Sequence, residues 1–147
     1  MNKMDRRGFL KTLGAGAALL SAPALALGAT RQVVVVGGGT GGVSVARALR
    51  RADATITVTL IEPDADYYTC YMSNEVVGGG RSLASIRFGY AGVQADGIQL
   101  VQDRVSAIDS AAQQVITASG VRLPYDRCIV SPGIDFRYDT VAGYDAS

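Results

Sequence analysis

Residues 33–42 read Val33-Val34-Val35-Val36-Gly37-Gly38-Gly39-Thr40-Gly41-Gly42, and this stretch decides the fold of the 147-residue chain. Four β-branched residues predict a buried strand, and the glycines after them predict a turn that leads into a helical pattern rich in Ala, Leu and Arg. Gly37, Gly39 and Gly42 fit the spacing G-x-G-x-x-G in the strand, turn and helix context that this motif requires.

Each glycine of the motif has its own physical reason. Gly37 allows a tight turn off the strand, Gly39 lets a pyrophosphate approach the backbone, and Gly42 lets the helix pack closely on the sheet. Thr40 stands where the helix is predicted to begin, and the free N–H groups and the positive end of the helix dipole there hold phosphates. The motif therefore predicts a dinucleotide site with Thr40 among its contacts.

An acidic residue follows the second predicted strand. Residues 55–61, Thr55-Ile56-Thr57-Val58-Thr59-Leu60-Ile61, read as this strand, and Glu62 comes at its carboxyl end, twenty residues after Gly42. A carboxylate at this place can accept hydrogen bonds from an adenosine ribose. The alternative is a glycine turn in an unrelated α/β unit, followed by a surface glutamate.

The first 28 residues have the layout of an export signal. Asp5-Arg6-Arg7-Gly8-Phe9-Leu10-Lys11 precedes an apolar run rich in Ala, Gly and Leu over residues 12–27. The Arg-Arg pair before Phe-Leu-Lys resembles a twin-arginine signal, although Asp5 stands where Ser or Thr is more usual. We expect residues 1–28 to be this signal peptide and the protein to reach the periplasm. The alternatives are a membrane anchor, which the short run rich in Gly and Ala disfavours, and a mitochondrial-type presequence, which Asp5 disfavours.

Composition excludes several kinds of chemistry. The chain has 14 basic and 13 acidic residues, no His and two Cys, and residues 29–147 carry ten basic and twelve acidic ones. The sequence has no basic excess of the kind that predicts binding to nucleic acid. It also has no second apolar span of the kind that predicts an integral membrane protein. Without His, the chain cannot build a Ser-His-Asp triad, a His-ligated zinc site or a proximal-His haem, and we predict no metal site. Without a C-x-x-C pair it has neither a thioredoxin motif nor a c-type haem attachment motif.

Short strand-like runs fill the second half of the chain. Residues 98–101 read as a third strand, and residues 104–108, 114–117 and 122–123 follow with turns between them, which is typical of an antiparallel meander. Residues 127–130 predict another buried strand. Residues 63–74 are polar and aromatic, so we expect a loop there, and Gly78-Gly79-Gly80 predicts a flexible turn or hinge.

This order of elements resembles the dinucleotide domain of flavin reductases of the glutathione-reductase class, in which a meander takes the place of a crossover helix. Ser131-Pro132-Gly133 resembles the second flavin contact of that class, where a glycine at a strand end comes close to the cofactor. The resemblance implies an α/β, Rossmann-like FAD-binding domain with an antiparallel β-meander. It favours FAD over NAD and implies that Ser131, Pro132 and Gly133 contact the cofactor.

A second resemblance is more specific. Residues 67–79, Tyr67-Tyr68-Thr69-Cys70-Tyr71-Met72-Ser73-Asn74-Glu75-Val76-Val77-Gly78-Gly79, are similar to the flavin-attachment segment of the flavoprotein subunit of flavocytochrome c sulfide dehydrogenase. Together with residues 37–42, Glu62 and residues 125–134, the similarity spans nearly everything after the leader. In that family the cysteine at the position of Cys70 carries FAD through a thioether to the flavin 8α-methyl, and the resemblance implies the same here.

The two cysteines also have simpler interpretations. A thiolate is a strong nucleophile, so attachment at Cys70 is chemically reasonable. Cys70 can instead be an ordinary loop thiol, or half of a Cys70–Cys128 disulfide in an oxidising compartment. Cys128 lies in an apolar strand beside Ile129 and Val130, which favours the role of a small buried hydrophobe.

The resemblance implies an enzyme that oxidises sulfide to sulfur or polysulfide and passes the electrons to a cytochrome c subunit. The redox-active cysteine pair of that family lies downstream of the segments matched here. We therefore expect residues 29–147 to be the amino-terminal part of an incomplete FAD-binding domain, without a catalytic residue and inactive alone. One alternative is a sulfide:quinone reductase or an NADH dehydrogenase-like flavoprotein of the same fold. Another is a truncated, non-catalytic chain that binds a nucleotide.

Overall fold

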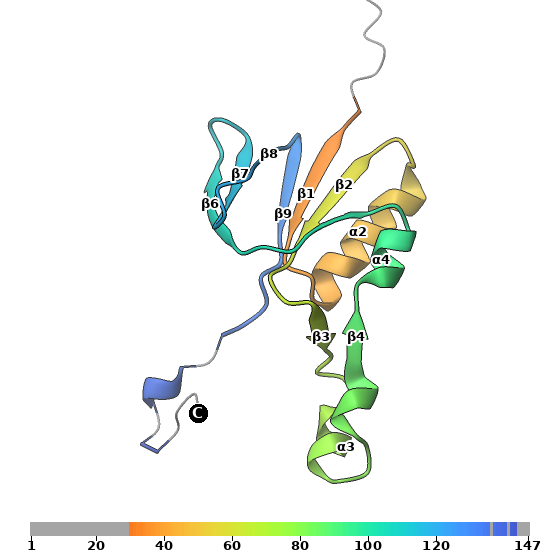
Figure 1. Cartoon of the computed structure of the whole chain (residues 1–147), viewed down its shortest axis with the longest axis vertical. Coiled ribbons are helices and arrows are strands. Elements are labelled where there is room, and N and C mark those ends of the chain that lie inside the picture. Colours follow the sequence, from red (N-terminus) through yellow and green to blue (C-terminus); the bar gives the residue numbers. More distant parts are fainter. Residues whose placement is uncertain (1–29, 136, 141, 144–147) are drawn as a thin grey trace, which may run out of the picture.

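A four-stranded parallel sheet forms the centre of the structure, a computed structural model that describes residues 30–135, 137–140 and 142–143 (Figure 1). Its strands lie in the order β5-β2-β1-β9, and every neighbouring pair is parallel. Their bounds are β1 (Gln32–Val36), β2 (Thr57–Ile61), β5 (Gln99–Val101) and β9 (Arg127–Val130). The four predicted strands are therefore confirmed, although β2 begins two residues later than predicted.

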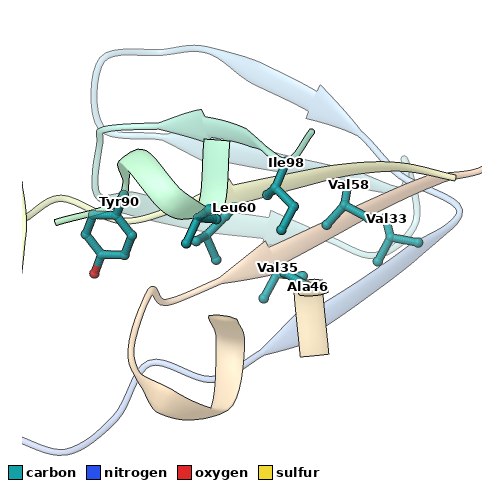
Figure 2. Packing of buried hydrophobic residues seen from close by; sticks show 8 residues of the cluster. Val33, Val35, Ala46, Val58, Leu60, Tyr90 and Ile98 are labelled. Atoms are coloured by element: carbon teal, nitrogen blue, oxygen red, sulfur yellow. The ribbon is translucent and has the colours of Figure 1, made fainter. Parts of the chain in front are cut away.

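Helices cover one face of this sheet. The helix α2 (Thr40–Ala52) follows the glycine turn, as predicted, and α4 (Ala91–Ala95) precedes β5. Their buried residues Ala46 and Val93 join one hydrophobic cluster with Val33 and Val35 of β1 (Figure 2). Since alternate residues of a strand point to opposite faces, Val33 and Val35 define the helix-covered face.

The meander covers the opposite face. Its antiparallel strands are β6 (Val105–Asp109), β7 (Gln114–Thr117) and β8 (Arg122–Pro124), which confirms the meander predicted from the sequence. Val34 of β1 and Ile61 of β2 point to this side and pack against Val115 of β7, which is fully buried. Burial of each such side chain contributes roughly 1.5–3 kcal/mol, so the two clusters hold the sheet from both sides.

A small antiparallel arm, residues 66–89, extends from the carboxyl edge of the parallel sheet (Figure 1). It contains β3 (Asp66–Tyr68) paired with β4 (Arg87–Gly89), and between them α3 (Ser73–Val77) and the 3-10 helix η1 (Leu83–Ile86). The expectation of a loop over residues 63–74 is therefore wrong for β3 and for the start of α3, whereas the turn expected at Gly78-Gly79-Gly80 is confirmed. A three-residue strand is too short to show the alternation of polar and apolar residues that predicts a strand. The strand β3 is instead defined by its pairing with β4, about twenty residues later in the chain, where Arg87 forms an ion pair with Asp66.

A second 3-10 helix, η2 (Tyr138–Thr140), comes after β9. The predicted leader, residues 1–28, lies outside the described residues. Among the helices that the structure does describe, none combines the length and the apolar character needed to cross a bilayer.

Candidate functional site

The site predicted from the sequence lies where the chain reverses its direction of travel across the sheet. From β1 the chain continues to β2 on one side and later returns to β9 on the other, so β1 and β9 flank the switch point. In open α/β sheets, ligands bind outside the carboxyl ends of the strands at such a point. The glycine turn, residues 37–39, begins at the carboxyl end of β1 (Figure 1).

Two glycines of the motif are required by the protein itself. Gly37 has a φ of +98°, and a Cβ built on it would lie 2.1 Å from the carbonyl oxygen of Ser131. A Cβ on Gly42 would lie 1.9 Å from the carbonyl oxygen of Gly37. Both distances are far below contact, so the turn, the start of α2 and the end of β9 can approach one another only without these side chains.

Gly39 is different because the protein does not fill the space around it. A Cβ on Gly39 would meet only Cε2 of Tyr67, at an ordinary 3.7 Å. Gly39 is the N-cap of α2, no side chain caps the helix there, and its first turn, which begins at Thr40, holds no acidic residue. The open space and the uncapped N–H groups fit an anionic group that comes close to the backbone, such as the pyrophosphate of a dinucleotide.

Glu62 stands at the carboxyl end of β2, as predicted, and faces the turn. Its Oε2 accepts a hydrogen bond of 2.7 Å from the N–H of Gly38, and its Oε1 accepts one of 3.1 Å from the N–H of Asp64. The side chain is half-buried. A carboxylate fixed in this way keeps its remaining lone pairs for other donors, and ribose hydroxyls are donors of the right kind.

The turn after β9 lies against the glycine turn. The N–H of Ser131 donates to the carbonyl of Val36 over 2.8 Å, and the Oγ of Ser131 lies 2.8 Å from where a Cβ on Gly41 would stand. The sequence did not indicate this constraint on Gly41. Gly133 has a φ of +82° with open space around it.

A cavity of about 660 Å³ opens at these strand ends. It brings together four of the predicted site residues, Gly37, Glu62, Pro132 and Gly133. The other residues that line it are Val36, Ile61, Pro63, Asp64, Arg104, Val105, Ile134 and Asp135. Arg104 supplies a cation that sequence reasoning missed. Arg104 follows three residues after the end of β5. Because the carboxyl ends of parallel strands lie at the same edge of a sheet, its position in the sequence could have indicated that it lies near the cavity.

Cys70 lies apart from this cavity, on the arm. It is exposed and follows β3, and its carbonyl accepts hydrogen bonds from the N–H and the Oγ of Ser73. Its neighbours Thr69 and Tyr71 line a second cavity of about 460 Å³, which Cys70 itself does not line. The structure thus presents the thiol on the surface of a structured arm that extends from the same sheet edge as the glycine turn (Figure 1).

Cys128 has the environment that the sequence favoured. It lies in β9, is partly buried and packs against the meander-side cluster, which is the cluster of Val34, Ile61 and Val115. Burial raises the pKa of its thiol, which makes it a poor nucleophile. Both cysteines are free in the structure, so the alternative of a Cys70–Cys128 disulfide is not observed.

Tyr90 is a further residue that sequence reasoning missed. It comes directly before α4, is 6% exposed, and its hydroxyl donates a hydrogen bond of 3.0 Å to the carbonyl of Gly38. Figure 2 shows its ring at one end of the helix-side cluster, which is the cluster that contains Val33, Val35 and Ala46, and its hydroxyl points away from this cluster. No sequence motif connects a tyrosine 52 residues downstream with the glycine turn.

A parallel sheet with a glycine turn at its switch point, a carboxylate at the next strand end and a meander on one face defines a Rossmann-like dinucleotide-binding domain. A family model described as "Pyridine nucleotide-disulphide oxidoreductase" matches residues 31–146. The chain belongs to the pyridine nucleotide-disulphide oxidoreductase family, which confirms the predicted fold class and supports a flavin-dependent oxidoreductase.

Individual relatives narrow the comparison. The chain is 55% identical over 47 residues to the flavoprotein chain of sulfide dehydrogenase (flavocytochrome c) of Chlorobaculum thiosulfatiphilum, which covers 32% of this chain and 98% of that short sequence. It is 28% identical over 112 residues to the mitochondrial sulfide:quinone oxidoreductase of Mus musculus, covering 76% of this chain and 25% of the relative. The resemblance to sulfide dehydrogenase flavoproteins predicted from the sequence is confirmed.

Solved structures agree with the fold. The sulfide:quinone oxidoreductase of Aquifex aeolicus superposes with a TM-score of 0.69 at 27% identity, over 74% of this chain and 25% of that one. The putidaredoxin reductase–putidaredoxin complex gives a TM-score of 0.63 at 28% identity, over 78% of this chain and 29% of that one. The chain thus spans about a quarter of the length of the longer relatives.

Proposed function

We propose that this chain binds FAD as part of a sulfide-oxidising flavoenzyme that passes electrons to a cytochrome c subunit. The observation that carries the proposal is the 55% identity to a flavocytochrome c sulfide dehydrogenase flavoprotein chain. The cavity of about 660 Å³ at the strand ends, which Gly37 and Glu62 line, supports the binding of the adenosine and pyrophosphate end of the cofactor. Bound FAD would supply acceptance of an electron pair and release of single electrons.

The predicted contacts have distinct roles in this proposal. Gly39 and the helix start at Thr40 face the pyrophosphate, because the protein leaves the space beside Gly39 open. Gly37 and Gly42 contribute by allowing the close packing that forms the turn. Glu62 receives the adenosine ribose. The turn Ser131-Pro132-Gly133 is the proposed second contact with the cofactor, and its Pro132 and Gly133 line the cavity together with Gly37 and Glu62.

Cys70 is the proposed point of covalent attachment for the flavin. The thiol is exposed, the Cys70 carbonyl accepts a hydrogen bond from Ser73, and the arm extends from the sheet edge that carries the glycine turn. FAD has its flavin and its adenosine at opposite ends. A protein that binds both ends therefore needs one contact at the glycine turn, for the adenosine end, and another on the arm, for the flavin. A thioether would prevent loss of cofactor in the periplasm, where we place the protein on the basis of the twin-arginine leader predicted for residues 1–28.

The acceptor separates this proposal from its main rival. A sulfide:quinone oxidoreductase is the second candidate, because relatives with this name match 70–76% of the chain. The test uses the protein from its complete reading frame, produced with its leader and any cytochrome partner. Sulfide is added anaerobically while flavin absorbance is followed, and reoxidation by cytochrome c is compared with reoxidation by a short-chain quinone.

The outcomes distinguish the candidates. We expect sulfide to bleach the flavin and cytochrome c to restore its absorbance much faster than quinone does. Faster reoxidation by quinone would replace the proposal by the second candidate. A protein that contains FAD but is not reduced by sulfide would contradict both, and reduction by NADH instead would point to an NADH dehydrogenase.

Export is tested separately. The change of Arg6 and Arg7 together to Lys removes the pair on which the twin-arginine route depends. We expect the variant to remain in the cytoplasm while the unchanged protein is recovered from the periplasm. Equal periplasmic recovery of both proteins would contradict the proposed route.

A further inference from the structure

The Gly38 residue of the glycine turn is held at both of its backbone polar groups. Its N–H donates to Oε2 of Glu62 over 2.7 Å, and its carbonyl accepts from the hydroxyl of Tyr90 over 3.0 Å. Gly38 is buried, and a Cβ on it would lie 2.6 Å from the Tyr90 hydroxyl and 2.8 Å from Cγ of Glu62. The two side chains therefore enclose this residue so closely that any side chain here would force Tyr90 or Glu62 to move.

The two contacts act on two successive peptide planes. The N–H of Gly38 belongs to the plane that it shares with Gly37, and its carbonyl belongs to the plane that it shares with Gly39. A trans peptide is planar, with its C=O and N–H pointing in opposite directions. When Tyr90 fixes the carbonyl of Gly38, it also fixes the direction of the N–H of Gly39, which points away from Tyr90.

The N–H of Gly39 is the group that this arrangement leaves for a ligand. Within the described residues it donates to no protein acceptor, and the space next to Gly39 is open. The neighbouring carbonyl of Gly39 already accepts from the N–H of Val43 over 3.0 Å, as the first bond of the helix. We infer that Tyr90 is a positioning residue, which aims the Gly39 N–H at the pyrophosphate of the bound dinucleotide.

The surroundings of Tyr90 suit a permanent donor. Burial, and after it the negative charge of Glu62, raises the pKa of the phenol well above its usual range, so the hydroxyl keeps its proton. Its ring is anchored in the helix-side cluster with Leu60 and Val93 (Figure 2). A donor anchored in the core holds the turn in one orientation before the ligand arrives, which reduces the reorganisation that binding requires.

This inference rests on the proposed binding of FAD. The test uses the protein from its complete reading frame with Cys70→Ala, so that any FAD is exchangeable. The dissociation constants of FAD and ADP are measured by calorimetry, together with the thermal midpoint of the empty protein. Tyr90→Phe keeps the ring and removes only the hydroxyl. Tyr125→Phe is the matched control, since Tyr125 packs on the meander side just before β9 and lines neither cavity.

We expect Tyr90→Phe to weaken the binding of FAD and ADP by roughly tenfold, as the buried carbonyl loses its donor, while Tyr125→Phe leaves both affinities unchanged. Combined with Glu62→Gln, the loss should be non-additive because Glu62 and Tyr90 hold the two backbone polar groups of the same residue, Gly38. Unchanged affinities in Tyr90→Phe, with only a lower thermal midpoint, would show a merely structural tyrosine and overturn the inference. If the Cys70→Ala protein binds neither ligand, the proposed function itself fails.

Discussion

The Oε2 of Glu62 accepts a hydrogen bond of 2.7 Å from the N–H of Gly38, so the residue predicted to bind the ribose also holds the turn predicted to bind the pyrophosphate. The two ends of the adenosine site are thus parts of one unit. A ligand that engages Glu62 also depends on the backbone that Glu62 orients.

Glu62→Gln is expected to weaken the binding of FAD and ADP by roughly tenfold, because a neutral amide accepts more weakly from Gly38 and from a ribose. Affinity is measured by calorimetry in the Cys70→Ala protein. The control is Asp109→Asn at the end of β6, because the Asp109 carboxylate also accepts from backbone N–H groups, those of Ala111 and Ala112, and lines neither cavity. Equal affinities for both variants would contradict the role given to Glu62.

Gly39 and Gly42 should respond differently to alanine. The Gly42→Ala methyl would meet the Gly37 carbonyl at 1.9 Å, so we expect a loss of about 3 kcal/mol in unfolding free energy. The Gly39→Ala methyl meets only Tyr67 at 3.7 Å, so stability should change by less than about 1 kcal/mol. FAD binding should nevertheless fall at least tenfold in Gly39→Ala, since the methyl enters the space left for the ligand.

Urea unfolding of the empty protein and calorimetry with FAD measure these two effects. Gly80→Ala is the control, because a Cβ there has only an ordinary contact of 3.7 Å with the Glu75 carbonyl. If Gly39→Ala binds FAD as tightly as this control does, the pyrophosphate does not lie at Gly39.

Acid should weaken the meander through Asp103. Hydrogen bonds from Ser119, and after it Thr117, lower the pKa of Asp103 to about 2. The unfolded pKa is about 3.9, so the stabilisation is fully present above pH 4 and is lost as the pH falls through about 2. Ser119→Ala removes the largest cause, so its unfolding free energy should fall less steeply with pH between about 4 and 2.

The free energy of unfolding, from urea titrations at several pH values, measures this slope. Ser110→Ala in the exposed turn after β6 is the control and should keep the slope of the unchanged protein. Identical slopes for Ser119→Ala and Ser110→Ala would contradict the assignment.

The sequence predicted the parts of the fold that depend on pattern. Four valines and a glycine motif identify β1 and α2, and the alternation of Val33, Val34 and Val35 between two clusters follows from strand geometry. The arm escaped prediction because β3 and β4 are too short to show a period, and their pairing depends on tertiary contacts.

The site was predicted only where a motif covers it. The glycines and Glu62 belong to a known spacing, whereas Tyr90 and Arg104 reach the site through the fold. The packing of α4 brings Tyr90 to the glycine turn, and Arg104 lies at the cavity because β5 ends at the same edge of the sheet as β1 and β2. Cys70 was indicated by resemblance alone, because no local pattern distinguishes an exposed thiol on the arm from any other loop cysteine.

The most direct test of the account is to locate the flavin. The protein from its complete reading frame is precipitated with acid and digested, and its peptides are followed by flavin fluorescence and mass. We predict that the yellow colour stays with the precipitate and that one peptide carries FAD on Cys70, while Cys128 remains an unmodified thiol and Cys70→Ala releases its flavin. Colour released into the supernatant of the unchanged protein, or flavin attached to another residue, would contradict the account.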